Sequence, residues 1–325
     1  MIQLISNSLK PLTGYHIFKS SAIPATLYCS EIWGLYHLTK LKDRTKRTES
    51  SPFPLEDFFL GKQFEINQRK FIRFLLGLSK HSCNLALYCE SGALPLYFDI
   101  LRNCLNFWLH ILDSPNYSLL KIAYKVNKDL STKNENIFIW CSQFSSILKY
   151  FGFEHLWINQ GTFSSRKTIS AFMESVKKDF FTMVRKYFVS QSVANGVFSS
   201  YIKINPKLEP PKFLLNFGTF FIRKFIFKLR SCDLAIETQN GRFRDKSLDK
   251  EERLCLSCDK RKCGDEYHFI FECSRLSTLR SIHLKEVTNK SLYEICNNES
   301  HSFNKSLSRF IKLAIREKWS KNQKS

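Results

Sequence analysis

Residues 253–273 read RLCLSCDKRKCGDEYHFIFEC, and this stretch holds four potential metal ligands at a regular spacing. Cysteines at 255, 258 and 273 and a histidine at 268 give the pattern Cys-x2-Cys-x9-His-x4-Cys. Zinc takes four nitrogen or sulfur ligands in a tetrahedron, and a Cys-x2-Cys turn supplies two thiolates to one ion. We therefore predict a small C-terminal zinc-binding knuckle with the ligands Cys255, Cys258, His268 and Cys273.

Two alternatives stay open at this stretch. Cys263 lies between the two halves of the pattern and is able to replace His268 or Cys273 as a ligand. The other alternative is that these are ordinary cysteines and a surface histidine. Gly264 and Asp265 predict the start of a helix that carries the last two ligands. A site with four protein ligands has no open position, so we expect the zinc to be structural rather than catalytic.

The composition predicts a mainly α fold, a multi-helix assembly with the small zinc-binding knuckle near its C-terminus. The chain has 325 residues and is 43% hydrophobic, which is enough to bury a core. It contains 30 phenylalanines but only 11 glycines, a poor fit to sandwiches, barrels and glycine-rich nucleotide folds. Helical periodicity and breaking residues predict helices over residues 58–78, 96–112, 137–151, 174–189, 221–229 and 303–316. The charged residues 41–54 are expected to form a loop, and residues 205–211 a proline-rich connector.

The net charge of +21 favours a polyanionic partner. We predict RNA or DNA, bound largely without regard to sequence, against the alternatives of a solvated basic surface or an anionic membrane. No membrane span or secretory signal is expected, and 11 cysteines without such a signal suggest reduced thiols in the nucleus or cytoplasm rather than secretion. The predicted phosphate-contacting residues are Arg223, Lys224, Lys228, Arg230, Arg242, Arg244, Lys260, Arg261 and Lys262.

Residues 253–280 resemble the region that follows the polymerase in reverse transcriptases of LINE-type (non-LTR) retrotransposons. That family carries a Cys-Cys-His-Cys cluster there. Upstream, residues 221–245 (FIRKFIFKLRSCDLAIETQNGRFRD) are similar to the family's basic helix and the strip before the finger, with Glu237, Gly241, Arg242 and Phe243 at matching positions. The segments 27–34, 68–80 and 84–98 resemble the start of the family's thumb, and residues 310–319 its terminal helix.

The resemblance implies four parts: a thumb-like helical region (1–125), a helical middle region with the connector (126–211), a basic helix with the zinc module (212–300) and a C-terminal amphipathic basic helix (301–325). The sequence departs from the family pattern in several places. Cys29 and Cys89 stand where we expect small, glycine-like residues, residues 238–240 form a short insertion, and Cys263 is additional.

The catalytic residues of the family's polymerase are missing from the sequence. Reverse transcription needs adjacent aspartates that hold two metal ions, and the chain has no Asp-Asp pair. It also lacks the Pro-Asp of the nuclease that some family members carry after the finger. The resemblance places the palm before residue 1. We therefore expect a nucleic-acid-binding C-terminal fragment that is not itself an enzyme. The alternatives are a zinc-stabilised protein-interaction scaffold and an element-derived product with no selected role.

Overall fold

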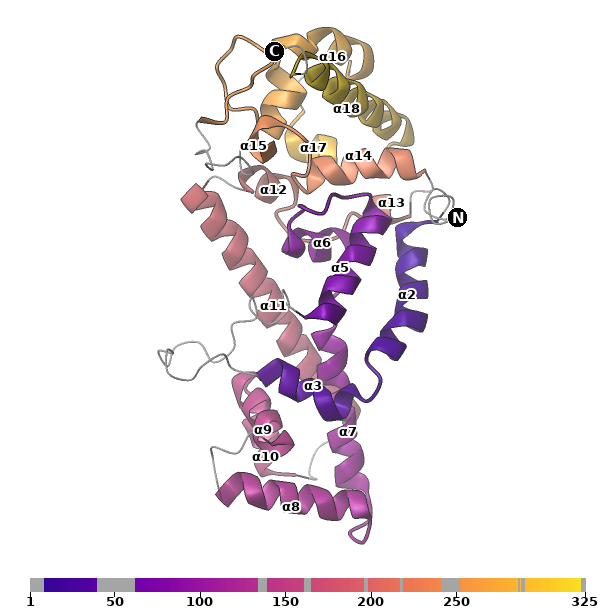
Figure 1. Ribbon diagram of the computed structural model, residues 1–325, viewed down its shortest axis with the longest axis vertical. Coiled ribbons are helices and arrows are strands. Elements are labelled where there is room, and N and C mark those ends of the chain that lie inside the picture. The colour runs from indigo at the N-terminus through magenta and orange to yellow at the C-terminus, as the bar shows by residue number, and fades with distance from the viewer. Residues whose placement is uncertain are drawn as a thin grey trace. The chain divides into compact units, whose positions relative to one another are not determined.

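The computed structural model describes residues 9–39, 62–133, 139–160, 165–195, 198–216, 219–240, 252–285, 287 and 290–322. Within these ranges the chain is built from helices, and the only β-type pairing is an isolated bridge between Leu254 and Cys263. The predicted mainly α fold is confirmed. Among the described helices, none combines the length and the apolar character that a bilayer crossing requires. The arrangement of the helices within each unit can be followed in Figure 1.

The chain divides into two compact units, each made of separate segments. Unit 1 comprises Met1–Phe18, Arg69–Ala93 and Met183–Ser325, and unit 2 comprises Lys19–Gln68 and Leu94–Thr182. The helices wholly inside unit 2 are α3 (Ser30–Thr39), α7 (Tyr97–Asp113), α8 (Leu119–Lys133), α9 (Trp140–Tyr150) and α10 (Glu154–Ile158). Those wholly inside unit 1 are α6 (Asn84–Ser91), α12 (Ser199–Ile204), α13 (Lys212–Leu215), α14 (Phe220–Arg230), α15 (Glu237–Asn240), η3 (His268–Glu272), η4 (Ser274–Leu276), α16 (Ser277–His283), α17 (Leu292–Cys296) and α18 (His301–Asn322). Residues of α2 (Pro11–Thr26), α5 (Gln63–Leu76) and α11 (Ser165–Asn195) belong to both.

Unit 2 has an aromatic core in which α3 packs against α7 and α9. Trp108 of α7 is fully buried, and its ring stacks with that of Trp157 at a centroid distance of 5.9 Å. Its indole nitrogen donates to the Tyr124 hydroxyl over 3.0 Å, so the polar atom of this large side chain is satisfied inside the core. Phe144 of α9 lies in the same cluster, as the helical period of residues 137–151 predicted.

The joint between α2 and α3 contains a residue in an unusual backbone conformation. Cys29 has a φ of +55°, in the left-handed region where glycine carries no steric penalty. A glycine at position 29 would adopt this conformation without strain. A glycine does occupy the comparable place after α5, where Gly77 has a φ of +69° and ends the helix.

Most of the predicted helices are present with shifted ends. The breaks expected at Gly77 and at Ser114–Pro115 fall directly after α5 and α7. The helix predicted over residues 174–189 is longer, because α11 runs from Ser165 to Asn195. Helices α6 and α8 were not predicted. The loop expected over residues 41–54 lies outside the described residues.

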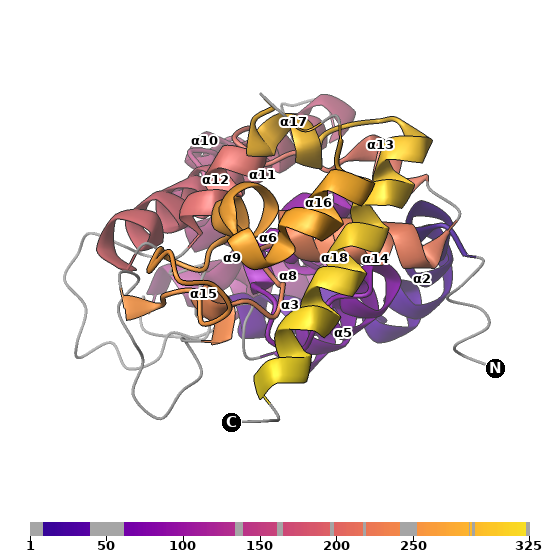
Figure 2. The ribbon, with the colours of Figure 1, turned by 90° about the horizontal axis from the view of Figure 1, so that it is seen from above.

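The core of unit 1 near the C-terminus is formed by α14 and α18, which lie side by side (Figures 1 and 2). Ile222 and Ile226 of α14 are buried, as are Leu307 and Phe310 of α18. These residues lie in the ranges 221–229 and 303–316, where the sequence predicted helical periodicity, and several basic residues of α18 lie on the opposite side of the helix. Lys305, Arg309 and Arg316 are exposed there.

Arg230, predicted to contact phosphates, is instead part of a buried ion pair. Its Nε donates to Glu90 Oε2 over 2.6 Å, and the two side chains are only 1% and 0% exposed. Arg230 also donates to the Asn297 side chain, and Asn205 donates to the second oxygen of Glu90. The guanidinium therefore ties α14 to α6 and α17. The prediction of a phosphate contact at Arg230 is wrong, because no ligand reaches this group without opening the core.

Arg223 requires the same correction. Its side chain is 1% exposed, and its guanidinium donates to the carbonyl oxygen of Leu9 over 2.6 Å. Burial lowers the pKa of Arg223 to about 10. The helical period placed this arginine beside the apolar stripe of α14, but the N-terminal segment of unit 1 covers that side.

Candidate metal centre

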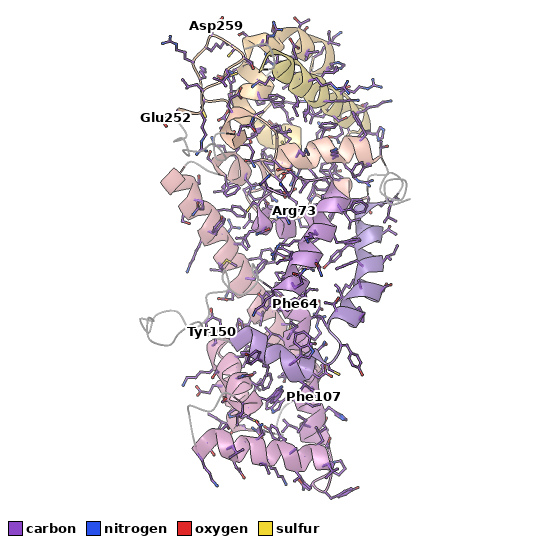
Figure 3. The ribbon with its side chains drawn as sticks, in the orientation of Figure 1. Phe64, Arg73, Phe107, Tyr150, Glu252 and Asp259 are labelled. Atoms are coloured by element: carbon purple, nitrogen blue, oxygen red, sulfur yellow. The ribbon has the colours of Figure 1, made fainter. Side chains whose placement is uncertain are left out.

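The first two proposed ligands lie on a short hairpin. Its ends are held by the bridge between Leu254 and Cys263 and by two backbone hydrogen bonds: the Cys255 amide donates to the Lys262 carbonyl, and the Gly264 amide donates to the Arg253 carbonyl, each over 2.8 Å. Asp259, labelled in Figure 3, lies on the exposed loop that follows Cys258. The hairpin therefore presents Cys255 and Cys258 from one closed loop.

The other two ligands lie at the two ends of a single wide helical turn. Asp265 Oδ1 accepts a hydrogen bond from the His268 amide over 2.8 Å and so caps this turn, which confirms the helix start predicted at Gly264 and Asp265. Residues His268–Glu272 then form a π-helical turn, and the Cys273 amide donates to the His268 carbonyl over 2.8 Å. The wide turn spans five residues, so His268 and Cys273 approach the hairpin together.

The four side chains form a set that fits one metal ion. Their ligand atoms all lie within 4.8 Å of one another. Cys255 Sγ lies 3.9 Å from Cys273 Sγ, and Cys258 Sγ lies 3.3 Å from His268 Nε2. Two sulfurs each bonded at about 2.3 Å in a tetrahedron are about 3.8 Å apart, so the sulfur pair has the separation that one shared ion imposes. Cys263 is not a member of this set.

The surroundings of the Cys255 and Cys273 thiols shift their pKa values in opposite directions. The shared contact with Cys255 lowers the pKa of Cys273 to about 7, and the nearby Lys318 ammonium lowers it further, although burial acts in the opposite direction. The same contact, together with burial, raises the pKa of Cys255 to about 12. Of the two thiols, Cys273 is therefore the one that more readily becomes a thiolate. A divalent cation between the two sulfurs favours the doubly deprotonated form, because thiolates are the species that bind metals.

An acidic side chain orients the histidine. Glu272 Oε2 lies 3.4 Å from His268 Nδ1, one turn along the same helical segment. The other Glu272 oxygen accepts from the Lys262 ammonium over 2.8 Å, and this bond is the main reason that the pKa of Glu272 is lowered. A carboxylate at Nδ1 holds the proton on that nitrogen and leaves Nε2, which faces Cys258, free to bind a metal.

The C-terminal helix α18 reaches the centre through one lysine. Lys318 is 6% exposed, and its ammonium lies 2.9 Å from Glu237 Oε2 and 3.6 Å from Cys255 Sγ. It also lies over the Phe269 ring, 5.6 Å from the centroid. Lys318 therefore places a positive charge beside a thiol that a metal would hold as a thiolate.

The sequence did not point to this lysine. Its partner Glu237 lies 81 positions earlier in the chain, and the spacing of the ligands does not link the two residues. Glu272 did carry a signal, since an acid four positions after a histidine falls on the same side of a helix. Glu237 was singled out only through the family resemblance. In the structure Glu237 also accepts from the Leu256 amide over 3.2 Å, so it holds the hairpin as well as Lys318.

The remaining predicted phosphate contacts fall into three groups. Lys260, Arg261 and Lys262 are exposed on the loop between Cys258 and the second half of the site. Lys224 and Lys228 of α14 are half-buried, and burial lowers the pKa of Lys228. Arg242 and Arg244 lie outside the described residues, as do Gly241 and Phe243. Among the described residues of the predicted surface, the basic loop next to the ligands is the part that is exposed.

No protein-family model, characterised protein or solved structure matches this chain. The geometry of this centre and the charges around it are therefore the structural basis for inferring what the chain does.

Proposed function

We propose that the chain binds RNA or DNA by contacting the phosphate backbone of the nucleic acid. A structural zinc ion at Cys255, Cys258, His268 and Cys273 shapes the surface that makes these contacts. We further propose that it has no polymerase or nuclease centre of its own and corresponds to the C-terminal part of a LINE-type reverse transcriptase. The resemblance of residues 221–245 and 253–280 supports that assignment.

The observation that carries the proposal is the position of the basic loop. Lys260 and Arg261 are exposed within three positions of Cys258, and the hairpin that presents them is closed by the backbone hydrogen bond from Cys255 to Lys262. A metal ion fixes such a loop by linking it to a second segment of the chain. Cations held in place lose less side-chain entropy when they contact a phosphate, so zinc and nucleic-acid binding are expected to be coupled.

Zinc is the metal that this donor set favours. Three thiolates and one imidazole in a tetrahedral arrangement are typical of structural zinc sites. The oxygen-rich sites that magnesium and calcium prefer contain no thiolates. Four protein ligands complete the coordination, and the neighbouring Glu272 and Lys318 are engaged in orienting and neutralising them.

A binding titration at several salt concentrations tests the proposal. It measures the affinity of the zinc-loaded full chain for a fluorescent single-stranded RNA and for a double-stranded DNA. Each lysine or arginine on a phosphate releases counterions, so the logarithm of the association constant should fall linearly with the logarithm of the salt concentration. The double variant K260A/R261A should bind more weakly and show a smaller slope. Binding that is absent at low salt contradicts the proposal.

A matched control is available on α11, where Lys177 and Lys178 are exposed and adjacent. The variant K177A/K178A removes the same charge from a different unit of the chain. If affinity falls by the same factor in both double variants, the effect comes from total charge and the basic loop has no special role. If the zinc-loaded chain folds but binds neither nucleic acid, the protein-interaction scaffold is the better account.

A further inference from the structure

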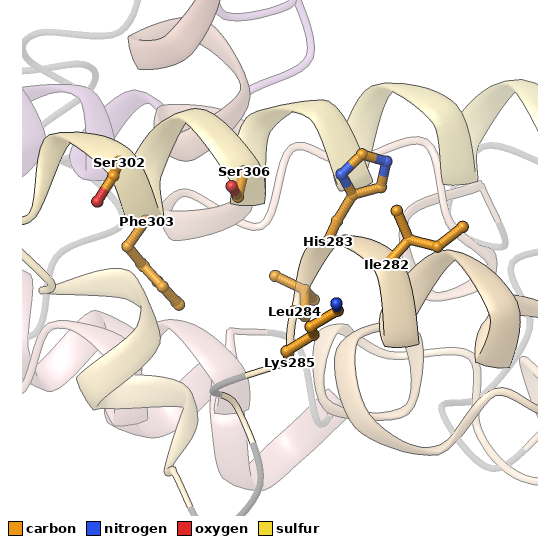
Figure 4. Close-up of a pocket in the computed structure, with 7 residues that line it drawn as sticks. All are labelled: Ile282, His283, Leu284, Lys285, Ser302, Phe303 and Ser306. Atoms are coloured by element: carbon orange, nitrogen blue, oxygen red, sulfur yellow. The ribbon is translucent and has the colours of Figure 1, made fainter.

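A separate pocket lies where the end of α16 meets the first turns of α18. It has a volume of about 230 Å³ and is lined by Ile282, His283, Leu284, Lys285, Ser302, Phe303 and Ser306 (Figure 4). None of these seven residues is one of the metal ligands or belongs to the basic loop. The pocket therefore needs an explanation of its own.

The polar groups of the pocket suit an anion. Lys285 and His283 come from the α16 side, and the hydroxyls of Ser302 and Ser306 come from two successive turns of α18. Figure 4 shows His283 beside α18 on the side of Ser306. None of the described residues that line the pocket is acidic. An ammonium, an imidazole and two hydroxyls together offer several hydrogen-bond donors toward one space.

A further cation lies next to this group. The Lys290 ammonium lies 5.1 Å from the centroid of the Phe303 ring, and Phe303 is buried at the floor of the pocket. Leu284 is also buried there, so the floor is apolar. The pocket is thus a basic rim above an apolar base.

We propose that this pocket binds a phosphate group. A phosphate monoester carries nearly two negative charges and three acceptor oxygens at neutral pH, which matches the cations and donors that line the pocket. Lys285 and His283 supply charge, while Ser302 and Ser306 donate hydrogen bonds that set the position of the phosphate. The group comes either from a phosphorylated end of a nucleic acid or from a free phosphorylated small molecule. The proposal does not depend on the nucleic-acid-binding function.

The proposed phosphate site is tested by titrating the zinc-loaded full chain with inorganic phosphate. The readout is the NMR resonance of the His283 imidazole. That resonance is identified by its loss in the variant H283Q. In the wild-type chain, phosphate should shift the His283 resonance in a saturable way. In K285A the apparent dissociation constant should rise about tenfold, because a charge-assisted hydrogen bond is lost.

The control is K305A, which removes an exposed lysine from the same helix but outside the pocket lining. K305A should titrate like the wild-type chain. A His283 resonance that phosphate leaves unchanged, or that responds equally in wild type and K285A, overturns the proposal.

A second arm identifies the source of the phosphate. Oligonucleotides of one sequence with a 5′-phosphate or a 5′-hydroxyl are compared by competition. A preference for the 5′-phosphate that K285A abolishes assigns the pocket to nucleic-acid ends. Equal binding of the two, with phosphate titration intact, assigns it to a free phosphorylated ligand. Phosphate titration without any oligonucleotide binding would refute the proposed nucleic-acid function while leaving the pocket assignment in place.

Discussion

The ammonium of Lys318 lies 3.6 Å from the sulfur of Cys255, although 63 residues separate them in the chain. This contact joins the last long helix to the candidate metal centre. A site with three thiolates and one neutral imidazole around a divalent ion has a net charge of −1. Glu237 adds a second negative charge beside it. Lys318 offsets these negative charges at a buried position. Helix α18 therefore contributes directly to the metal centre.

Replacing Lys318 by methionine should destabilise this part of unit 1. The substitution keeps much of the side-chain volume but leaves Glu237 and the thiolate without their cation. Removing one partner of a buried ion pair costs about 3 kcal/mol or more, because the other charge remains buried. Urea unfolding followed by circular dichroism measures the change. K305M, at an exposed position on the same helix, is the control. Equal midpoints for the two variants would show that Lys318 is not coupled to the centre.

Removing Glu272 should weaken metal binding without removing a ligand. The variant E272Q keeps the shape of the side chain but loses the carboxylate that faces His268 Nδ1. Outer partners of this kind typically contribute about tenfold or more to metal affinity. Competition with a chromophoric zinc chelator measures the affinity. E299Q changes an exposed glutamate elsewhere in unit 1 and should leave the affinity unchanged. The role assigned to Glu272 would be refuted if both variants held zinc equally well.

Gly264 is expected to tolerate no side chain. A Cβ at this position would lie 2.5 Å from Glu237 Oε2 and 2.7 Å from Glu237 Cβ. G264A should therefore displace Glu237 from Lys318 and from the Leu256 amide, with loss of zinc affinity in the chelator assay. Gly152 provides a contrast, because its φ is +80° but no atom lies within 4 Å of the added Cβ. G152A should cost about 1 kcal/mol of backbone strain and leave zinc binding intact.

The buried pair of Glu90 and Arg230 gives a prediction that separates structure from nucleic-acid contact. R230M should lower the free energy of unfolding by about 3–5 kcal/mol, since the Glu90 carboxyl group stays buried without the guanidinium that pairs with it. The double variant E90Q/R230M should recover part of that loss. Thermal denaturation measures both. If R230M folds normally and only nucleic-acid binding suffers, Arg230 is a surface contact after all and the buried pair is wrong.

The sequence predicted the features that depend on local spacing. The four ligands, the capped turn at Asp265 and the apolar stripe of α18 each follow from residues close together in the chain. The same periodicity failed at Arg223 and Arg230. It placed both on the polar side of α14, but a helix that is covered on more than one side buries polar residues too. Their partners, Leu9 and Glu90, lie more than a hundred residues away.

Long-range partners also explain what was missed at the metal centre. No pattern around Cys255 points to Lys318, because their contact arises only when α18 packs beside the finger. Cys263 shows the converse. Its spacing in the sequence is acceptable for a ligand, and only the geometry of the hairpin excludes it from the ligand set. Cys263 pairs across the bridge with Leu254 and is outside the ligand set. The resemblance to the LINE-type family, its four-part division and the absence of catalysis stay predictions.

The four-ligand metal centre is tested most directly by the zinc content of the purified full chain and of three cysteine variants, measured by elemental analysis at a known protein concentration. We expect one zinc ion per wild-type chain, loss of that zinc in C255S and C258S, and its retention in C263S. A wild-type chain without zinc, or a chain that loses zinc in C263S but retains it in C258S, would show that these four residues do not hold the ion.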